Sequence, residues 1–207
     1  MNFMTSSRGR VFANNSASLD SSDEDECKCK VLVVNNHIYF YEDISIDSIR
    51  MLTHKVKEVE NQNIQMQMDY SLDTPPKIFV HIQSYGGDAY AGLSGMDTLK
   101  GCRVPVVTIV EGFVASAATF LLLGGKERWM QPHSNILIHQ IRTEFWGRFD
   151  ELKDEMLNSD NLMKMITSIY KENSSFPLRT LNNIIKKEIH MDAKECLKHG
   201  IVDKITS

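Results

Sequence analysis

Residues 104–125 read VPVVTIVEGFVASAATFLLLGG, and this stretch decides the fold. Its beginning, 104–110, is rich in β-branched residues and predicts a strand, whereas 117–123 predicts a buried helix that a glycine pair ends. Ser116 stands at the junction, beside the unpaired N–H groups of the first helical turn, where a developing negative charge is stabilised. A serine in this place is either a nucleophile or an ordinary helix N-cap.

The flanking sequence continues this alternation of strand and helix. Strands are predicted at 31–34, 37–41, 77–82, 105–110 and 135–139, and helices at 46–60, 89–99 and 117–123. The first two strands form a hairpin or two separate strand pieces, and polar, methionine-rich 61–76 predicts a surface loop. The alternation predicts an α/β fold with a parallel sheet and right-handed crossovers.

Three candidate functional features fall at one edge of this sheet. Gly86-Gly87, Ser116 and His139 lie at the carboxyl ends of predicted strands, where parallel sheets place their active sites. Alone, the glycine pair is a turn or a close approach to a ligand, and His139 is more often a structural histidine. Together they predict acyl transfer, in which an imidazole takes the serine proton and main-chain amides bind the oxyanion.

The amino-acid composition limits the functional classes to which this protein can belong. The 207 residues are 42% hydrophobic, enough for one well-filled core, and a net charge of −4 without a dense Lys/Arg cluster argues against nucleic-acid binding. No run approaches the roughly 20 apolar residues of a membrane span. Residues 1–30 contain no secretory h-region, so we expect a soluble protein inside a cell or organelle.

The first 30 residues differ from the rest. They are polar and rich in Ser and Asn, and the acidic run at 20–26 reads DSSDEDE. Such a segment buries too little to order itself, so we expect a disordered tail at 1–30 and a folded domain at 31–207. The fragment 6–10, SSRGR, is alternatively the start of a partner-binding loop or part of a targeting peptide.

Metal and nucleotide sites are not predicted. The cysteines form no CxxC pair and are expected to be reduced, structural thiols; they are Cys27, Cys29, Cys102 and Cys196. No histidine pair has the spacing of a zinc peptidase, and neither GxGxxG nor a phosphate-binding P-loop occurs. We expect no cofactor in this chain.

Four short motifs carry a resemblance to a known family. They are IQSYGG at 82–87, GFVASA at 112–117, IHQ at 138–140, and AKEC at 193–196 with GIVD at 200–203. From about 38 to 205 the chain thereby resembles the proteolytic subunit of the Clp protease, a serine peptidase of the crotonase-like superfamily. The matching family motifs are I-x-S-P-G-G, G-x-A-A-S-x, I-H-Q, and A-x-E-A with G-L-V-D.

The resemblance implies an α/β, crotonase-like fold of stacked β/α repeats and a serine peptidase site. Ser116 resembles the nucleophile and His139 the general base, and the amides of Gly87 and Ala117 resemble the oxyanion hole. The family's acid is an aspartate just before A-x-E-A, and counting back along this chain gives Glu188.

Three positions depart from the family pattern. Glu188 is one methylene longer than aspartate, so either its loop has shifted or the triad is imperfect, and Asp192 is a second candidate for the acid. Tyr85 and Ile141 replace prolines that would stiffen loops beside the substrate. These changes leave the nucleophile and the base in place.

A long amphipathic helix is predicted at about 147–172. Its roughly 25 residues make a rod of about 35–40 Å, longer than one domain of this size needs for its core. It is either a plain surface helix or an apolar face that another subunit covers. In the family it resembles the handle by which two seven-membered rings meet in a hollow tetradecamer.

The resemblance implies a serine endopeptidase that cleaves unfolded polypeptides delivered by an ATP-driven AAA+ unfoldase ring. An inactive or weakly active structural ring subunit is the second hypothesis, supported by Glu188 and Tyr85. A crotonase-fold acyl-CoA enzyme is the third. The expected compartment is the cytoplasm of a bacterium or an infected host cell, or alternatively an organelle stroma or matrix.

Overall fold

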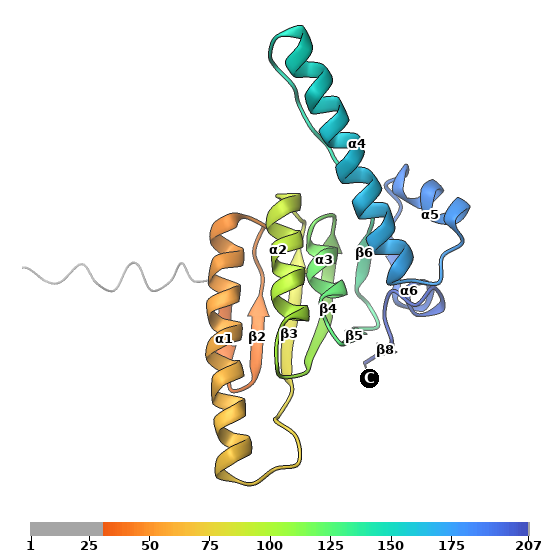
Figure 1. Cartoon of the computed structure of the whole chain (residues 1–207). Helices are drawn as coiled ribbons and strands as arrows, with labels where there is room; N and C mark the ends of the chain where they lie inside the picture. The colour runs from red at the N-terminus through yellow and green to blue at the C-terminus, as the bar shows by residue number, and fades with distance from the viewer. Residues whose placement is uncertain (1–30, 207) are drawn as a thin grey trace, which may run out of the picture.

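The computed structural model describes residues 31–206 (Figure 1). The tail predicted at 1–30, with its acidic run, the fragment 6–10, Cys27 and Cys29, lies outside these residues. The division of the chain into this tail and a domain at 31–207 stays a prediction.

A mixed sheet forms the centre of the described region. Its eight strands are β1 (Val31–Val34), β2 (His37–Phe40), β3 (Ile78–Ser84), β4 (Val106–Ala115), β5 (Glu127–Met130), β6 (Asn135–Leu137), β7 (Met191–Asp192) and β8 (Lys204–Ile205). The main order is β1-β2-β3-β4-β5-β8, and all of these strands except β1 run parallel, as predicted. β1 and β2 form an antiparallel hairpin, which settles the alternative left open by the sequence.

Six helices lie within residues 31–206. They are α1 (Ile46–Asp69), α2 (Ala89–Lys100), α3 (Ala118–Leu123), α4 (Phe149–Glu172), α5 (Leu178–Ile185) and α6 (Ala193–Lys198). Figure 1 shows α1, α2 and α3 side by side, each connecting two neighbouring parallel strands. No helix within residues 31–206 is long and apolar enough to span a bilayer.

Helix α1 is longer than predicted. A reciprocal capping box between Ser45 and Ser48 starts it, and its buried stripe includes Val56 and Val59. The surface loop predicted from residue 61 was wrong for its first nine residues, because no glycine or proline ends the helix there. The amide of buried Asn63 also donates to the carbonyl of Pro76, at 2.9 Å.

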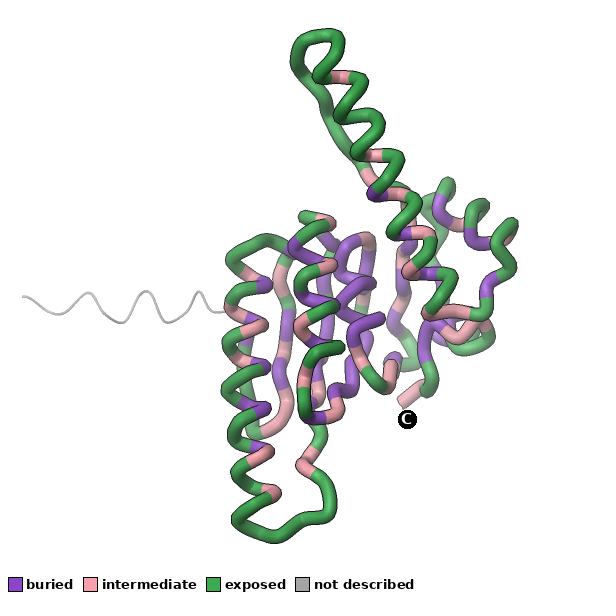
Figure 2. The backbone as a smooth tube through the Cα atoms, in the orientation of Figure 1, coloured by how far each residue is buried: buried purple, intermediate pink, exposed green. Residues whose placement is uncertain are grey.

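Helix α4 is the long helix predicted at about 147–172. Only its second half packs on the domain, through Leu162, Ile166 and Tyr170. Its first half projects away and is mostly exposed, with Leu152 and Ser159 at intermediate exposure (Figure 2). Exposed apolar side chains on this part include Phe149, which is 72% exposed, and Met156.

One buried hydrogen bond joins α4 to the centre of the sheet. The hydroxyl of Tyr170, which is 1% exposed, lies 2.5 Å from that of Thr119 in α3. Thr119 also contacts the carbonyl oxygen of Ser116 at 2.6 Å. Burial is the main cause of a strongly raised pKa for Tyr170, so its hydroxyl stays protonated. The root of α4 is therefore fixed to the β4–α3 junction.

Glu60 is a buried carboxylate in α1. It accepts hydrogen bonds from the ammonium of Lys57 and from the main-chain N–H of Arg103. Burial acts to raise its pKa, but the hydrogen bonds from Lys57, Arg103 and the Cys102 thiol outweigh burial and lower the pKa to about 2. The ionised form therefore stabilises the connection between α1 and the start of β4.

We expect Glu60 to make stability depend on acid. Because its pKa in the folded protein lies below the ordinary 4.5, its contribution is present above about pH 4.5 and is lost as the pH falls toward about 2. Glu60→Gln should lower the free energy of unfolding at neutral pH by up to about 3 kcal/mol and flatten this acid limb. Urea unfolding at several pH values measures both effects. Glu58 is an exposed carboxylate of the same helix whose pKa is lowered by a hydrogen bond from Lys55, but solvent screens that pair, so Glu58→Gln should change the profile much less. Equal profiles for wild type and Glu60→Gln would contradict the assignment.

Candidate active site

Three strand ends meet at one cleft of about 560 Å³. Gly87 follows β3, Ser116 follows β4 and His139 follows β6, and all three line the cleft. Leu162 of α4 forms part of the opposite wall. The structure therefore brings together the serine, the histidine and the glycine turn that the sequence singled out.

Ser116 has an unusual backbone conformation. Its φ is 54°, in the left-handed region that few residues other than glycine adopt. Its N–H donates to the carbonyl of Leu137 at 2.9 Å, and its carbonyl accepts from the N–H of Thr119 at 3.0 Å. The N-cap position of α3 is Ala117, without a side-chain hydrogen bond, so Ser116 is not an ordinary N-cap. Strain of this kind is concentrated at functional sites.

The two glycines of the turn pack closely against their neighbours, Gly86 against this serine and Gly87 against Ile44. Gly86 has φ 99°, and a Cβ there would lie 2.7 Å from the Cβ of Ser116. Gly87 has φ 143°, and a Cβ there would lie 2.1 Å from the carbonyl oxygen of Ile44. The N–H of Ile44 donates to the carbonyl of Gly86 at 2.7 Å, which fixes the turn. Only glycine fits at either position.

Two main-chain amides near Ser116 are unengaged. Among the hydrogen bonds of residues 31–206, none uses the N–H of Gly87 or of Ala117 as a donor. Ala117 follows the serine directly, and Gly87 lines the same cleft. Paired free amides beside a hydroxyl are what an oxyanion hole requires.

His139 is held beside the cleft with one ring nitrogen unsatisfied. The N–H of the next residue, Gln140, donates to the carbonyl of Ile185 at 2.8 Å and anchors the segment. Nδ1 of His139 is buried, and no described residue forms a hydrogen bond with it. Burial, followed by the charge of Arg142, lowers the pKa of His139 below 6.5, although the charge of Glu188 and a hydrogen bond with the backbone of Gln140 oppose them. The ring is therefore neutral at physiological pH, as a general base must be.

Neither candidate acid is hydrogen-bonded to His139. Glu188, which is 56% exposed, forms an ion pair with Arg142. Asp192 instead caps α6, where its Oδ1 accepts from the N–H of Glu195 at 2.8 Å. Glu188 is thus the acid whose charge acts on His139, and Asp192 is used elsewhere.

Sequence reasoning missed two contributors to this region. Arg142 lies three residues after His139 and lines the cleft, but an isolated arginine after a strand gave no signal. Ser84 accepts a hydrogen bond from the N–H of Gly86 at 3.2 Å and so supports the glycine turn. In the sequence, Ser84 is one position of the IQSYGG motif, and no role was predicted for it separately.

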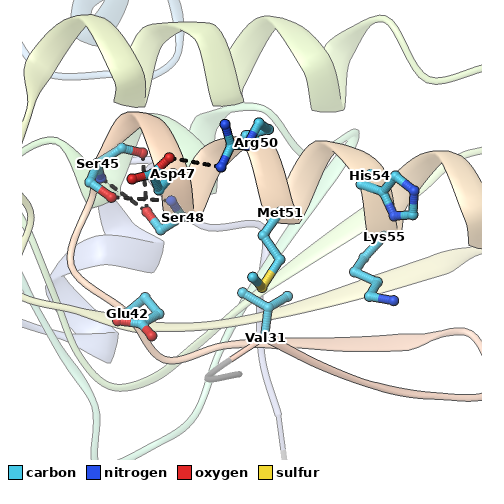
Figure 3. Close-up of a pocket in the computed structure, with 9 residues that line it drawn as sticks. All are labelled: Val31, Glu42, Ser45, Asp47, Ser48, Arg50, Met51, His54 and Lys55. Carbon is cyan, nitrogen blue, oxygen red and sulfur yellow. Dashed lines mark hydrogen bonds and ion pairs between the residues drawn. The ribbon is translucent and has the colours of Figure 1, made fainter. Parts of the chain in front are cut away.

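A second cavity, of about 650 Å³, lies along the first half of α1 (Figure 3). It contains two serines and a histidine, but Ser45 and Ser48 are engaged in the capping box, and His54 pairs with Glu58 at 3.5 Å. No nucleophile and base meet among the residues that line it. Within residues 31–206 no group of three or more His, Cys, Asp or Glu is arranged to hold a metal ion.

The fit of Gly86 against Ser116 predicts a large effect of one methyl group. Gly86→Ala combines a strained φ with contacts of 2.7 and 2.8 Å, so the free energy of unfolding should fall by more than about 2 kcal/mol. Gly200→Ala is the matched control, because its φ is also positive, at 67°, but the nearest atom lies 3.7 Å away. That variant should lose only about 1 kcal/mol. Equal losses in denaturant unfolding would contradict a close fit at Gly86.

Comparisons with known proteins agree with this geometry. A family model described as Clp protease matches residues 35–207. The ATP-dependent Clp protease proteolytic subunit of Lobularia maritima is 30% identical over 154 residues, which cover 72% of this chain and 78% of the relative. The protein of the same name from Oenothera elata subsp. hookeri is 30% identical over 195 residues, covering 90% and 76%.

A solved structure supports the fold. A ClpP1 mutant from Listeria monocytogenes superimposes with a TM-score of 0.70 at 19% identity, and the match covers 84% of this chain and 92% of that chain. The predicted α/β, crotonase-like fold with its long projecting helix is confirmed. The expectation of a peptidase rather than an acyl-CoA enzyme agrees with the relatives. The chain therefore belongs to the Clp protease family, as a proteolytic subunit.

Proposed function

We propose that this chain is a serine endopeptidase in which Ser116 is the nucleophile and His139 the general base. The observation that carries the proposal is the single cleft shared by the strained serine, the neutral histidine and the glycine turn. The two unengaged amides of Gly87 and Ala117 are the proposed oxyanion hole. Glu188 is the proposed acid of the triad.

The mechanism follows from these positions. His139 accepts the hydroxyl proton while the Ser116 oxygen attacks a peptide carbonyl, and the two amides stabilise the oxyanion of the tetrahedral intermediate. The protonated imidazole then gives its proton to the departing amine, which leaves an acyl-enzyme. Water, deprotonated by the same imidazole, releases the acyl group. No step requires a metal or organic cofactor in this chain.

The assembly and the partners extend this proposal. The curated relatives are named ATP-dependent, and since this chain carries no P-loop, we place ATP hydrolysis in an AAA+ unfoldase ring that delivers unfolded polypeptides. The exposed apolar part of α4 is the proposed contact between seven-membered rings stacked as a tetradecamer. The cytoplasm of a bacterium or infected host is the proposed compartment, with an organelle stroma or matrix as the alternative.

The nucleophile is testable with a fluorophosphonate. The reagent should label the wild type on Ser116, Ser116→Ala should not react, and His139→Ala should react several orders of magnitude more slowly, because the base is lost. Ser94→Ala, at an exposed serine of α2, should be labelled like the wild type. Intact-mass spectrometry with peptide mapping gives the site. Labelling that persists in Ser116→Ala would refute the proposal.

The base is testable by its pH dependence. His139 acts only when neutral, and burial lowers its pKa below 6.5, so the acylation rate should be constant at pH 7 and above. As the pH falls through the lowered pKa, the ring becomes protonated and the rate should decline, with a midpoint below 6.5. The rate of fluorophosphonate labelling, measured in samples quenched at fixed times across pH 4.5–8.5, gives this midpoint. A midpoint above pH 7 would exclude a buried, neutral His139 as the base.

A further inference from the structure

The unsatisfied nitrogen of His139 and the ion pair between Arg142 and Glu188 belong to one arrangement. We propose that Arg142 is a positioning residue that competes with His139 for the carboxylate of Glu188 and keeps the catalytic triad incomplete. The inference rests on the proposed function, since it concerns the orientation of its general base. It assigns a restraining role to a side chain that neither motif nor fold marks.

Glu188 forms an ion pair with Arg142, and its charge also acts on His139. A terminal nitrogen of the Arg142 guanidinium donates to Oε1 of Glu188, and within residues 31–206 Arg142 has no other ion-pair partner. His139 is close enough for the charges of both side chains to act on its ring. A guanidinium binds a carboxylate more strongly than a neutral imidazole does, because its hydrogen bonds are charge-assisted.

The Nδ1 atom of His139 is buried, so the absence of a hydrogen-bond partner for it has an energetic cost. A buried nitrogen without a hydrogen-bond partner costs free energy, and native proteins keep few of them. The carboxylate of Asp192 is engaged by the cap of α6, which leaves Glu188 to satisfy Nδ1. Nδ1 of His139 thus has no hydrogen-bond partner among the described residues, while the carboxylate that could accept from it is bound by Arg142.

The exchange of partners needs little rearrangement. Arg142 lies in the irregular segment between β6 and α4, and Glu188 in the irregular segment between α5 and β7. Their side chains are 73% and 56% exposed, so neither is locked by packing. Glutamate has one more rotatable bond than aspartate, which lets its carboxylate swing between a guanidinium and an imidazole on a fixed backbone.

The chemical effect is on the tautomer of His139. When Glu188 accepts from Nδ1–H, the lone pair of Nε2 is available to Ser116, and the imidazolium formed during attack is stabilised. When Arg142 holds Glu188, the tautomer is not fixed, and the positive guanidinium opposes protonation of the ring. Acylation is then slow, although the nucleophile and the oxyanion amides are in place.

The decisive experiment is a double-mutant cycle on Arg142 and Glu188. Arg142→Met keeps an unbranched, flexible side chain but removes the guanidinium and releases the carboxylate, so the fluorophosphonate acylation rate should rise at least about tenfold, within the roughly 10⁴-fold range that an orienting acid controls. Arg142→Met combined with Glu188→Gln should show no such gain over Glu188→Gln alone, because no carboxylate is present to reach His139. Arg142→Lys, which keeps one charge without the guanidinium fork, should fall between wild type and Arg142→Met.

Titration of the ring separates this role from a structural one. In Arg142→Met the pKa of His139, followed by NMR of its ring protons, should rise, because Arg142 is gone and Glu188 approaches; these are the charged groups that act on the ring. An unchanged or reduced rate in Arg142→Met, or an equal gain in both Glu188 backgrounds, would overturn the proposal. Failure of the proposed function itself looks different, since no variant and no wild type would then be acylated on Ser116.

Discussion

The left-handed peptide at Ser116 is the constraint on which the rest of the site depends. One edge of β4 pairs with β3 as far as Val114, whereas the other edge pairs with β5 through Val110 and then with β6 over the last three residues, so one strand joins both parts of the sheet. The register with β6 brings His139 to the same edge, and Gly86 packs closely against the Cβ of Ser116. The hydroxyl, the imidazole and the glycine turn are therefore positioned by strand pairing rather than by flexible loops.

The parts predicted from the sequence are those that local patterns determine. The β3-α2-β4-α3 alternation and the convergence of Ser116 with His139 follow from apolar periodicity and from the rule that parallel strands end at one edge. The short strands β5, β7 and β8 were missed because, unlike the similarly short β1 and β2, they contain no run of β-branched or aromatic residues, and they are extended by pairing with a neighbour. The Arg142–Glu188 pair was also missed, since it joins irregular segments 46 residues apart.

Two ionisable groups in this protein differ in whether their buried polar atoms have hydrogen-bond partners. Glu60 is buried and satisfied by Lys57 and the N–H of Arg103, as a structural carboxylate requires. His139 is half-buried and its buried Nδ1 is unsatisfied, although the charge of Glu188 influences its pKa. An unsatisfied buried nitrogen costs stability, so its presence at the cleft is the kind of feature that is concentrated at functional sites.

The hydroxyl contact between Tyr170 and Thr119 has a mechanical consequence. Thr119 contacts the carbonyl of Ser116, so the peptide plane of the serine, a hydroxyl of α3 and the inner end of α4 form one rigid linkage. The outer half of α4 projects from the domain beyond this linkage (Figure 2). A force on the outer half of α4 is therefore transmitted to the peptide of Ser116 through these two short hydrogen bonds. A contact at the outer end of the helix thus acts on the serine as well.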